Sequence, residues 1–295
     1  MEEIKNCLIC GKPDFTSYLN CTDYFLTKET FNIVKCKSCG FIFVNPRPSK
    51  AELYKYYESQ EYISHSGTKK GLVNFVYTKI RKYTHSTKLQ LVGKYAKGKN
   101  ILDIGCGSGE LLSLLKNKGW QTLGIEPNQN ARNFAVSEYK LDVKDESEIE
   151  NIRDNSKDVI SMWHVLEHVS DLNERVGELK RILKKDGTVF IAVPNSISYD
   201  AKYYKEFWAA YDVPRHLYHF TPDSMKRLLE KFKFNITEIV PMKFDSYYVS
   251  MLSEKYKTGR SNILKASYIG WKSNRYARKD KISYSSLLYV IHNVS

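Results

Sequence analysis

The segment that most restricts how this chain can fold is a glycine-rich turn in its first half. The segment reads ILDIGCGSGELL, with three glycines between an apolar run and an amphipathic stretch. Glycine lets a ligand approach the backbone closely, and the apolar run before the turn predicts a buried strand at Ile101–Ile104. The amphipathic stretch after the turn predicts a helix that begins at Glu110 and is closed by Gly119.

Apolar runs and amphipathic stretches alternate through most of the remaining chain. Apolar runs predict strands at Gln121–Ile125, Leu141–Val143, Val159–Trp163, Thr188–Val193, Asn235–Val240 and Ser286–Val290. Helical spacing predicts helices through Ala131 and Ala135, over Leu172–Lys185, and from Thr221-Pro222-Asp223 to about Lys231. Strands that alternate with helices form a parallel sheet covered on both faces, so the sequence predicts a doubly wound α/β fold.

Charged residues around the glycine turn indicate which nucleotide it could bind. A dinucleotide fingerprint has glycine at its sixth position and a diphosphate at the helix N-terminus, but this chain has Glu110 there and Asp103 before the turn. Two carboxylates repel a diphosphate and suit a ligand that carries a sulfonium and an amino group. Glu126, at the end of the second strand, can accept hydrogen bonds from both ribose hydroxyls. These residues favour S-adenosylmethionine over NAD; the alternative is a turn whose glycines only allow packing.

The same segments resemble the class I S-adenosylmethionine-dependent methyltransferases. The stretches ILDIGCGSGELL, GIEPN, DVISMWHVLEHV and LKRILKKDGTVFIAVPN have the order and spacing of that family, over about residues 85–240. The resemblance implies a seven-stranded, mostly parallel, Rossmann-like sheet whose last strand, at Ser286–Val290, is antiparallel.

The resemblance also implies a set of cofactor-binding residues. Asp103, Gly105 and Gly107 would lie near the methionine part, Glu126 would bind the ribose, and Pro127 and Asn128 would flank the adenine. The full predicted set is Asp103, Gly105, Cys106, Gly107, Gly109, Glu126, Pro127, Asn128, Trp163 and His164.

Two cysteine pairs near the N-terminus predict a metal site. Cys7 and Cys10 form one C-x-x-C-G motif, and Cys36 and Cys39 form a second. Four thiolates at this spacing can surround one tetrahedral Zn²⁺ ion, and such a closed site is structural because it has no position open to water. The alternative is that these cysteines are unligated buried thiols.

We therefore expect four regions along the chain. They are a small zinc-ribbon-like module at 1–48, a helical linker or lid at 49–98, the S-adenosylmethionine-binding methyltransferase core at 99–241, and a basic helical insertion with the last strand at 242–295. A cysteine-paired module ahead of such a core also resembles a group of bacterial methyltransferases that act on sugars and secondary metabolites.

Two histidine-containing segments are candidates for the chemistry. His164 follows the fourth strand, and in the ubiquinone-pathway O-methyltransferases a similar segment has an acidic residue there and can bind a divalent metal. The loop after the fifth strand contains His216 and His219, either of which we prefer to His164 as the base that removes a hydroxyl proton. In the same loop Arg215 could bind an anionic group and Tyr211 could contact the substrate; the alternative is that these side chains only anchor the loop.

The charge of the chain leaves its partners open. Forty-six Lys and Arg side chains outnumber 33 Asp and Glu, and residues 242–281 alone contain ten basic and three acidic side chains. Nucleic acid, a membrane surface, an anionic substrate or simply a solvated face could each explain this excess. We expect no membrane-spanning segment, and the acidic first residues without an apolar stretch predict a cytoplasmic protein with no signal peptide.

These observations predict a methyltransferase with S-adenosylmethionine and structural Zn²⁺ that acts on a small molecule, preferably on a hydroxyl of a sugar or metabolite. Methylation of a sugar nucleotide at carbon, or of RNA or another nucleic acid, are the alternatives. The sequence does not indicate an oligomeric state.

Overall fold

The computed structural model describes residues 1–57, 72–260 and 262–294. Within this part the chain forms two compact units. One comprises Met1–Ser59, His164–Asn173 and Ala192–Tyr289, and the other comprises Gln60–Trp163, Glu174–Ile191 and Val290–Ser295. None of the helices in the described ranges is long and apolar enough to cross a bilayer.

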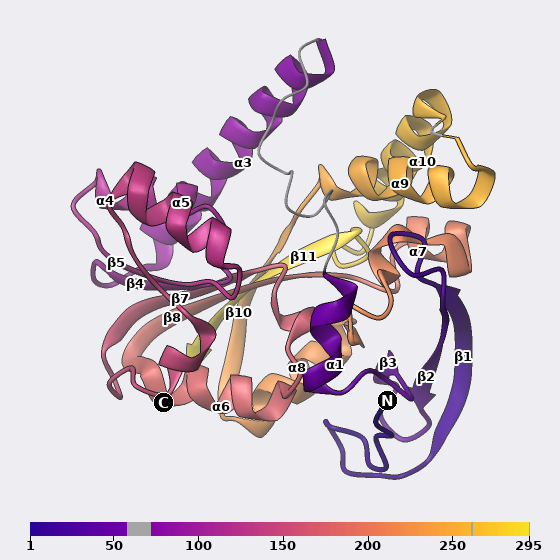
Figure 1. Ribbon diagram of the computed structural model, residues 1–295, viewed down its shortest axis with the longest axis horizontal. Coiled ribbons are helices and arrows are strands. Elements are labelled where there is room, and N and C mark those ends of the chain that lie inside the picture. The colour runs from indigo at the N-terminus through magenta and orange to yellow at the C-terminus, as the bar shows by residue number, and fades with distance from the viewer. Residues whose placement is uncertain (58–71, 261, 295) are drawn as a thin grey trace. The chain divides into compact units, whose positions relative to one another are not determined.

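The larger sheet has seven strands, as predicted (Figure 1). Its order is β10-β11-β8-β7-β4-β5-β6. The strands are β4 (Asn100–Ile104), β5 (Gln121–Ile125), β6 (Asp142–Lys144), β7 (Lys157–Trp163), β8 (Leu183–Pro194), β10 (Phe234–Pro241) and β11 (Ser286–Asn293). Strand β4 is parallel to both β5 and β7, and β5 is parallel to β6, so the side chains that follow these strands emerge at one edge.

The helices of the predicted core also form where the sequence indicates. They are α4 (Glu110–Lys116), α5 (Gln129–Tyr139) and α6 (Leu172–Ile182), with α3 (Leu72–Tyr95) preceding the sheet. On α6 the apolar positions Leu172, Val176 and Leu179 are all fully buried, because their spacing places them on one face of the helix.

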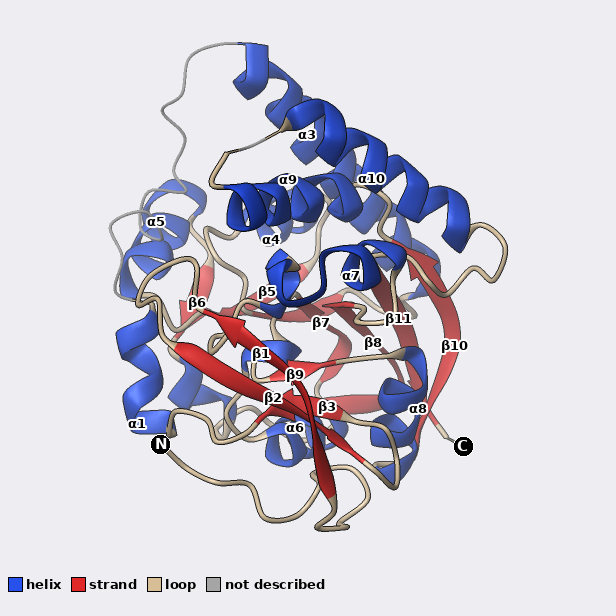
Figure 2. Cartoon of the chain, turned by 90° about the vertical axis from the view of Figure 1, so that its right-hand side faces the viewer, coloured by secondary structure: helices blue, strands red, loops and turns tan. Residues whose placement is uncertain are grey.

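A second sheet contains the N-terminal strands (Figure 2). Strands β1 (Phe15–Thr22), β2 (Thr30–Cys36) and β3 (Ile42–Val44) form an antiparallel meander, and β9 (Tyr218–His219) pairs with β3 as the fourth strand. The predicted module at 1–48 therefore shares a sheet with a segment from the second half of the chain. Cys21, on β1, is buried in this unit together with Phe31 and Ile33.

Most of the remaining helices lie in the first unit, and the 3-10 helix Glu146–Ile149 lies in the second. Helix α8 (Pro222–Lys231) begins at the predicted cap, where Thr221 Oγ1 accepts a hydrogen bond from the Ser224 amide. The predicted helical insertion consists of α9 (Asp245–Thr258) and α10 (Ile263–Ala277), which pack against each other. Shorter elements are α1 (Lys50–Leu53), α7 (Tyr199–Tyr204) and the 3-10 turns Tyr54–Tyr56, Glu146–Ile149, Leu166–His168, Lys205–Phe207 and Ala209–Tyr211.

One glycine of the turn between β4 and α4 allows a stability prediction. Gly109 has φ +78°, and a Cβ atom there would lie 2.6 Å from Leu141 Cδ1. Gly119 has nearly the same φ, +77°, but has open space where a Cβ would be. We expect Gly109→Ala to lower the free energy of unfolding by about 2–4 kcal/mol, the sum of backbone strain and overpacking. Gly119→Ala should lower it by about 1–2 kcal/mol, from strain alone. Denaturant unfolding would show equal losses for the two variants if the close contact at Gly109 were unimportant.

Candidate functional site

The glycine turn forms an open backbone cradle at the end of β4. The amides of Gly105 and Cys106 donate hydrogen bonds to the Ile125 carbonyl, at 2.7 and 3.1 Å, which fixes the turn beside the end of β5. Gly107 has φ +53°, and no atom lies within 4 Å of where its Cβ would be. A ligand could therefore approach the backbone here without meeting a side chain.

Asp103 is the buried carboxylate of this cradle. Its side chain is only 3% exposed, and Ser161 Oγ donates a hydrogen bond to Asp103 Oδ1 at 2.6 Å. Burial raises the pKa of Asp103 to about 6, although Ser161 and the nearby Lys88 act in the opposite direction. A buried acid with a raised pKa is ionised at neutral pH at an energetic cost, which a bound cation would offset.

Glu126 lies at the end of β5 and organises the other side of the cradle. Its two carboxylate oxygens accept hydrogen bonds from the amides of Gly107, at 2.8 Å, and Asn128, at 2.9 Å. Burial raises the pKa of this carboxyl group as well. The side chain therefore faces the glycine turn, as its predicted role as a ribose acceptor requires.

Three more residues of the predicted cofactor set have other local contacts. Cys106 Sγ packs over Gly124, where an added Cβ would lie only 2.6 Å from the sulfur, so this thiol fills space between the turn and β5. Arg132 donates a hydrogen bond to the Pro127 carbonyl, and Asn128 caps α5 by accepting from the Ala131 amide. These contacts position the backbone that follows Glu126.

Trp163, at the end of β7, stacks on Phe190 with the ring centroids 6.4 Å apart. The Lys88 ammonium lies 4.3 Å from the centroid of the Trp163 ring, and the indole Nε1 is buried without a hydrogen-bond partner among the described residues. The buried carboxylate of Asp103 and the open glycine backbone together fit a cationic nucleoside ligand such as S-adenosylmethionine.

His164 lies between two carboxylates. Its backbone has φ +58°, and its ring nitrogens lie 3.1 Å from Asp245 Oδ2 and 3.5 Å from Glu167 Oε1. Burial lowers the pKa of His164, but the two carboxylates outweigh it and raise this pKa to about 10. The two carboxylates thus favour the protonated form of this imidazole, which agrees with the preference for another histidine as the base.

Glu167, His168 and His216 form a cluster of possible ligands. One ligand atom from each of the three residues lies within 4.8 Å of the others. Glu167 is fully buried, and neither carboxylate oxygen has a hydrogen-bond partner in the described part of the chain, apart from the 3.5 Å ion pair with His164. Burial lowers the pKa of His168 to about 4, so this imidazole is neutral.

Backbone carbonyls fix which ring nitrogen of His168 and of His216 is the hydrogen-bond donor. His216 Nδ1 lies 2.8 Å from the Ala210 carbonyl, and His168 Nδ1 lies 3.1 Å from the Arg215 carbonyl and 3.0 Å from the Tyr57 hydroxyl. Because a carbonyl only accepts, each Nδ1 is the donor, and Nε2 is the ring nitrogen left to interact with other groups. Two such nitrogens beside a buried carboxylate could accept a proton or hold a divalent cation.

The other predicted residues of the 211–219 loop are buried. His219, on β9, is 3% exposed and packs edge-on against the ring of Tyr211, which is itself 2% exposed. Burial lowers the pKa of His219 far below its usual range. Both side chains are buried in these positions, which argues against His219 as a base and against Tyr211 as a substrate contact.

Arg215 has a structural role instead of the expected substrate-binding role. Its guanidinium donates to both carboxylate oxygens of Asp212, at 2.7 and 3.0 Å, to Asp23 at 2.9 Å and to the Tyr56 carbonyl at 3.2 Å. The side chain is almost fully buried, and these acceptors occupy most of its donors.

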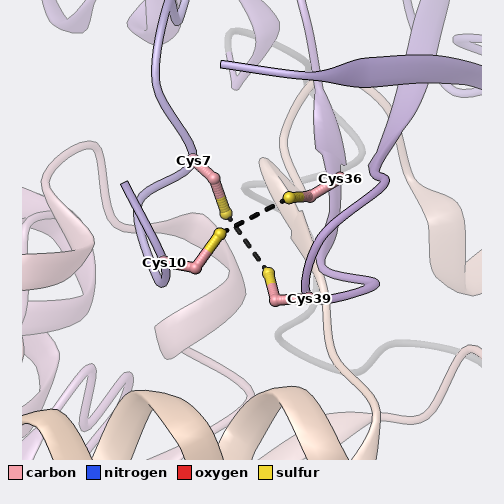
Figure 3. Close-up of side chains that lie close together, drawn as sticks. All are labelled: Cys7, Cys10, Cys36 and Cys39. Atoms are coloured by element: carbon pink, nitrogen blue, oxygen red, sulfur yellow. Dashed lines mark hydrogen bonds between the residues drawn. The ribbon is translucent and has the colours of Figure 1, made fainter. Parts of the chain in front are cut away.

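The four predicted cysteine ligands converge (Figure 3). Cys7 Sγ lies 3.5 Å from Cys39 Sγ, and Cys10 Sγ lies 3.6 Å from Cys36 Sγ. Bonds of about 2.3 Å from four sulfurs to a tetrahedral ion would place the sulfurs about 3.8 Å apart. Burial raises the pKa of the Cys7 thiol to about 11, so four thiolates this close together need a cation between them. This donor set fits Zn²⁺.

Sequence reasoning did not select several residues that shape these sites. Lys88, on α3, lies outside every motif quoted above. The apolar residues around Ser161 predict a strand but give no sign that this hydroxyl contacts Asp103. Asp245 is separated from His164 by 81 positions, and no local pattern connects them. Glu167 and His168 stand in the motif DVISMWHVLEHV, so the resemblance was the one available signal.

Comparison with known proteins identifies the family. The family described as "Methyltransferase domain" matches residues 77–239, which is more than half of the chain. The chain belongs to this methyltransferase domain family. The match begins within α3 and ends in β10, so it includes the whole glycine turn, Glu126 and the His164–His168 segment.

Curated relatives of this methyltransferase domain match about half of the chain. The ubiquinone biosynthesis O-methyltransferase of Pelagibacter ubique is 31% identical over 160 residues, which cover 50% of this chain and 65% of the relative. The mitochondrial enzyme of that name from Bos taurus is 27% identical over 171 residues, covering 52% and 46% of the two chains. The matched part thus spans between about half and two thirds of these relatives' own lengths.

Solved structures support the fold of the methyltransferase. A SAM-dependent methyltransferase from Thermotoga maritima superposes with a TM-score of 0.53 at 16% identity, covering 82% of this chain and all of that one. Geranyl diphosphate C-methyltransferase from Streptomyces coelicolor, solved with Mg²⁺, geranyl diphosphate and S-adenosyl-L-homocysteine, has a TM-score of 0.52 at 13% identity, covering 74% and 80%. The fold is therefore that of class I S-adenosylmethionine-dependent methyltransferases.

The raised pKa of Asp103 makes a pH-dependent prediction. Above pH 6 the ionised carboxylate destabilises the folded chain but attracts a cationic cofactor. We expect Asp103→Asn to raise the melting temperature of the unliganded protein at pH 8 more than at pH 4. The same change should weaken S-adenosylmethionine binding at least tenfold at pH 8 and remove the loss of affinity that the wild type shows below pH 6. Calorimetry and thermal scans at both pH values measure these effects; unchanged affinity in Asp103→Asn would contradict the assignment.

Proposed function

We propose that this chain transfers the methyl group of S-adenosylmethionine to a hydroxyl oxygen of a small molecule, and that His216 removes the hydroxyl proton. The observation that carries the proposal is the imidazole of His216, whose Nδ1 is held by the Ala210 carbonyl at 2.8 Å. S-adenosylmethionine supplies an electrophilic methyl group on a sulfonium, so the acceptor oxygen needs only alignment and loss of its proton.

The proton step follows from the tautomer of His216. With Nδ1–H bonded to a carbonyl, Nε2 accepts the hydroxyl proton while the oxygen forms its bond to the methyl carbon and the carbon–sulfur bond breaks. Glu167 is buried, and its contact with His164 lowers its pKa. Its negative charge would stabilise the imidazolium of His216. His164 remains protonated throughout and balances part of that charge.

The same cluster could instead hold a divalent cation. Nε2 of His168, Nε2 of His216 and a Glu167 oxygen make a two-histidine, one-carboxylate set, and such a set leaves positions open for an acceptor hydroxyl. A metal-bound hydroxyl loses its proton more readily, so His216 would then act as a ligand and not as a base.

The curated relatives support an oxygen acceptor. Those with the ubiquinone biosynthesis name are O-methyltransferases, and they are 31% and 27% identical to this chain over 160 and 171 residues. We extend this to the chain as a small-molecule hydroxyl, of a phenol, sugar or other metabolite. The cluster shows no preference for an anionic acceptor, because Arg215 is engaged with Asp23 and Asp212.

Replacing His216 tests the proposed base. Tritiated methyl transfer to a panel of phenols, sugar nucleotides and RNA would first identify the acceptor class, and transfer to RNA alone would contradict the proposal. With a phenol or sugar acceptor we expect His216→Gln to lower kcat about 10²–10⁴-fold while the Kd for S-adenosylmethionine is unchanged.

His219→Gln is the matched control for this test, because His219 lies three positions from His216 but is buried and is not part of the three-residue cluster. It should retain kcat in protein whose melting temperature shows that it is folded. Activity that appears only with added Mg²⁺ or Mn²⁺ would assign the cluster to a metal. Full activity of His216→Gln without metal would contradict both roles.

We also propose that Cys7, Cys10, Cys36 and Cys39 bind one structural Zn²⁺ ion. Their arrangement supports this, since two pairs of sulfurs lie 3.5 and 3.6 Å apart and each pair of cysteines is followed by a glycine with positive φ. A closed four-thiolate site would join the N-terminal segment to the end of β2.

Metal analysis tests the zinc proposal. The purified chain should contain one zinc ion, and Cys10→Ser or Cys39→Ser should lose it and melt at a temperature several degrees lower, because metal binding contributes directly to folding. Cys106→Ser, outside the cluster, should retain the zinc. Protein with no zinc after growth in zinc-supplemented medium, and with unchanged stability in the presence of a chelator, would overturn this assignment.

A further inference from the structure

Helix α10 buries mainly small and polar residues and exposes most of its large apolar ones. The side chains turned toward the rest of its unit are Ala266, Ile269, Gly270, Ser273, Asn274 and Ala277. On the outside, Leu264 is 85% exposed, Tyr268 54% and Trp271 45%. Exposed apolar side chains that are neighbours on one face mark an interaction surface, because a helix of a soluble domain normally has the opposite distribution.

Specific contacts fix this orientation of α10. Ser273 Oγ donates a hydrogen bond to the buried carboxylate of Asp200 at 2.6 Å, and Ser246 Oγ on α9 donates to the Gly270 carbonyl at 3.1 Å. A Cβ on Gly270 would lie 2.8 Å from Tyr247 Cδ1, so α9 and α10 are in close contact there. The helix therefore cannot rotate to cover its apolar face without breaking buried hydrogen bonds.

Basic side chains accompany this apolar face. Residues 263–281 contain six Lys and Arg side chains and one Asp. The Lys272 ammonium lies 5.1–6.0 Å from the ring centroids of Tyr199, Tyr268 and Tyr276, and the Arg275 guanidinium lies 5.2 Å from that of Trp271. Cations and aromatic rings are thus interleaved beside the exposed aliphatic residues.

We propose that the outer face of α10 docks on a membrane surface rich in anionic lipid. Leu264 would enter the apolar boundary of the bilayer, Tyr268 and Trp271 would lie at headgroup level, and Arg275, Arg278 and Lys279 would pair with lipid phosphates. This is the composition of helices that lie in the interface: an apolar face with tryptophan, flanked by lysine and arginine. The positive charge complements the negative surface of such a membrane.

A lipid surface fits this face better than a nucleic acid does. Base stacking requires free aromatic faces, but Tyr199 and Tyr276 stack on each other at 4.8 Å and Tyr268 stacks on Trp271 at 6.1 Å. Ile263 and Leu264, 63% and 85% exposed, are aliphatic and have no role in stacking. Both would lose contact with water on insertion into a lipid interface.

Vesicle binding tests the proposal with the full chain. The wild type should co-sediment with phosphatidylcholine vesicles that contain 30% phosphatidylglycerol and not with pure phosphatidylcholine. Leu264→Ser/Trp271→Ser and, separately, Arg275→Ser/Arg278→Ser/Lys279→Ser should each weaken binding at least tenfold. Phosphatidylcholine brominated on its acyl chains should quench tryptophan fluorescence in the wild type, and this quenching should be lost in Leu264→Ser/Trp271→Ser.

Matched controls separate docking by α10 from general charge attraction. Phe134→Ser/Val136→Ser removes comparable exposed apolar side chains from α5, and Lys97→Ser/Lys99→Ser/Lys118→Ser removes the same charge elsewhere. Both should bind vesicles like the wild type, and melting temperatures would show that every variant is folded. The proposal is overturned if the controls weaken binding as much as the α10 variants, if vesicles do not bind, or if filter binding shows that α10 retains RNA and not lipid.

Discussion

The buried guanidinium of Arg215 holds the histidine cluster in place. Its side chain joins Asp23, which follows β1, to Asp212 and to the Tyr56 carbonyl, so it connects the N-terminal segment to the loop after β8. Its own carbonyl accepts from His168 Nδ1, and His216 is the next residue. A charge that is buried with two carboxylates and four hydrogen bonds cannot move without a large cost, since a single missing partner leaves an unpaired charge. The proposed base thus has a rigid support.

The sequence predicted most regular elements of the core, because their signals are local. The predicted strand Gln121–Ile125 and the helix starting after Thr221 form at those residues, and Asp103 and Glu126 face the glycine turn. Burial of a polar side chain by a distant partner has no local signal. Arg215 seemed suited to an anionic substrate only because Asp23, 192 positions earlier, could not be seen as its partner. The charge of His164 similarly depends on Asp245.

The N-terminal region shows the same limit at the scale of a domain. The four cysteines converge as their spacing predicts, but the boundary at residue 48 does not correspond to a structural division, because β9 completes the sheet of β1, β2 and β3. His219 lies on β9, so pairing with β3 buries this histidine. A two-residue strand is too short to produce an alternating pattern, and its partner lies more than 170 positions away. The sequence could not therefore distinguish His219 from His216, although their structural roles differ.

Helix α10 shows why the basic charge of residues 242–281 could not be interpreted from composition. Large apolar residues and small residues both recur at helical spacing along α10. The sequence therefore does not say whether the face with Leu264, Tyr268 and Trp271 or the face with the small residues packs inward. The contacts decide it: Gly270 permits close approach to α9, and Ser273 reaches the buried carboxylate of Asp200, which also accepts from Trp208 and Ser285. A large apolar side chain at Gly270 or Ser273 would prevent this packing. The polar interior of α10 is thus what forces its apolar residues outward, next to the excess of positive charge.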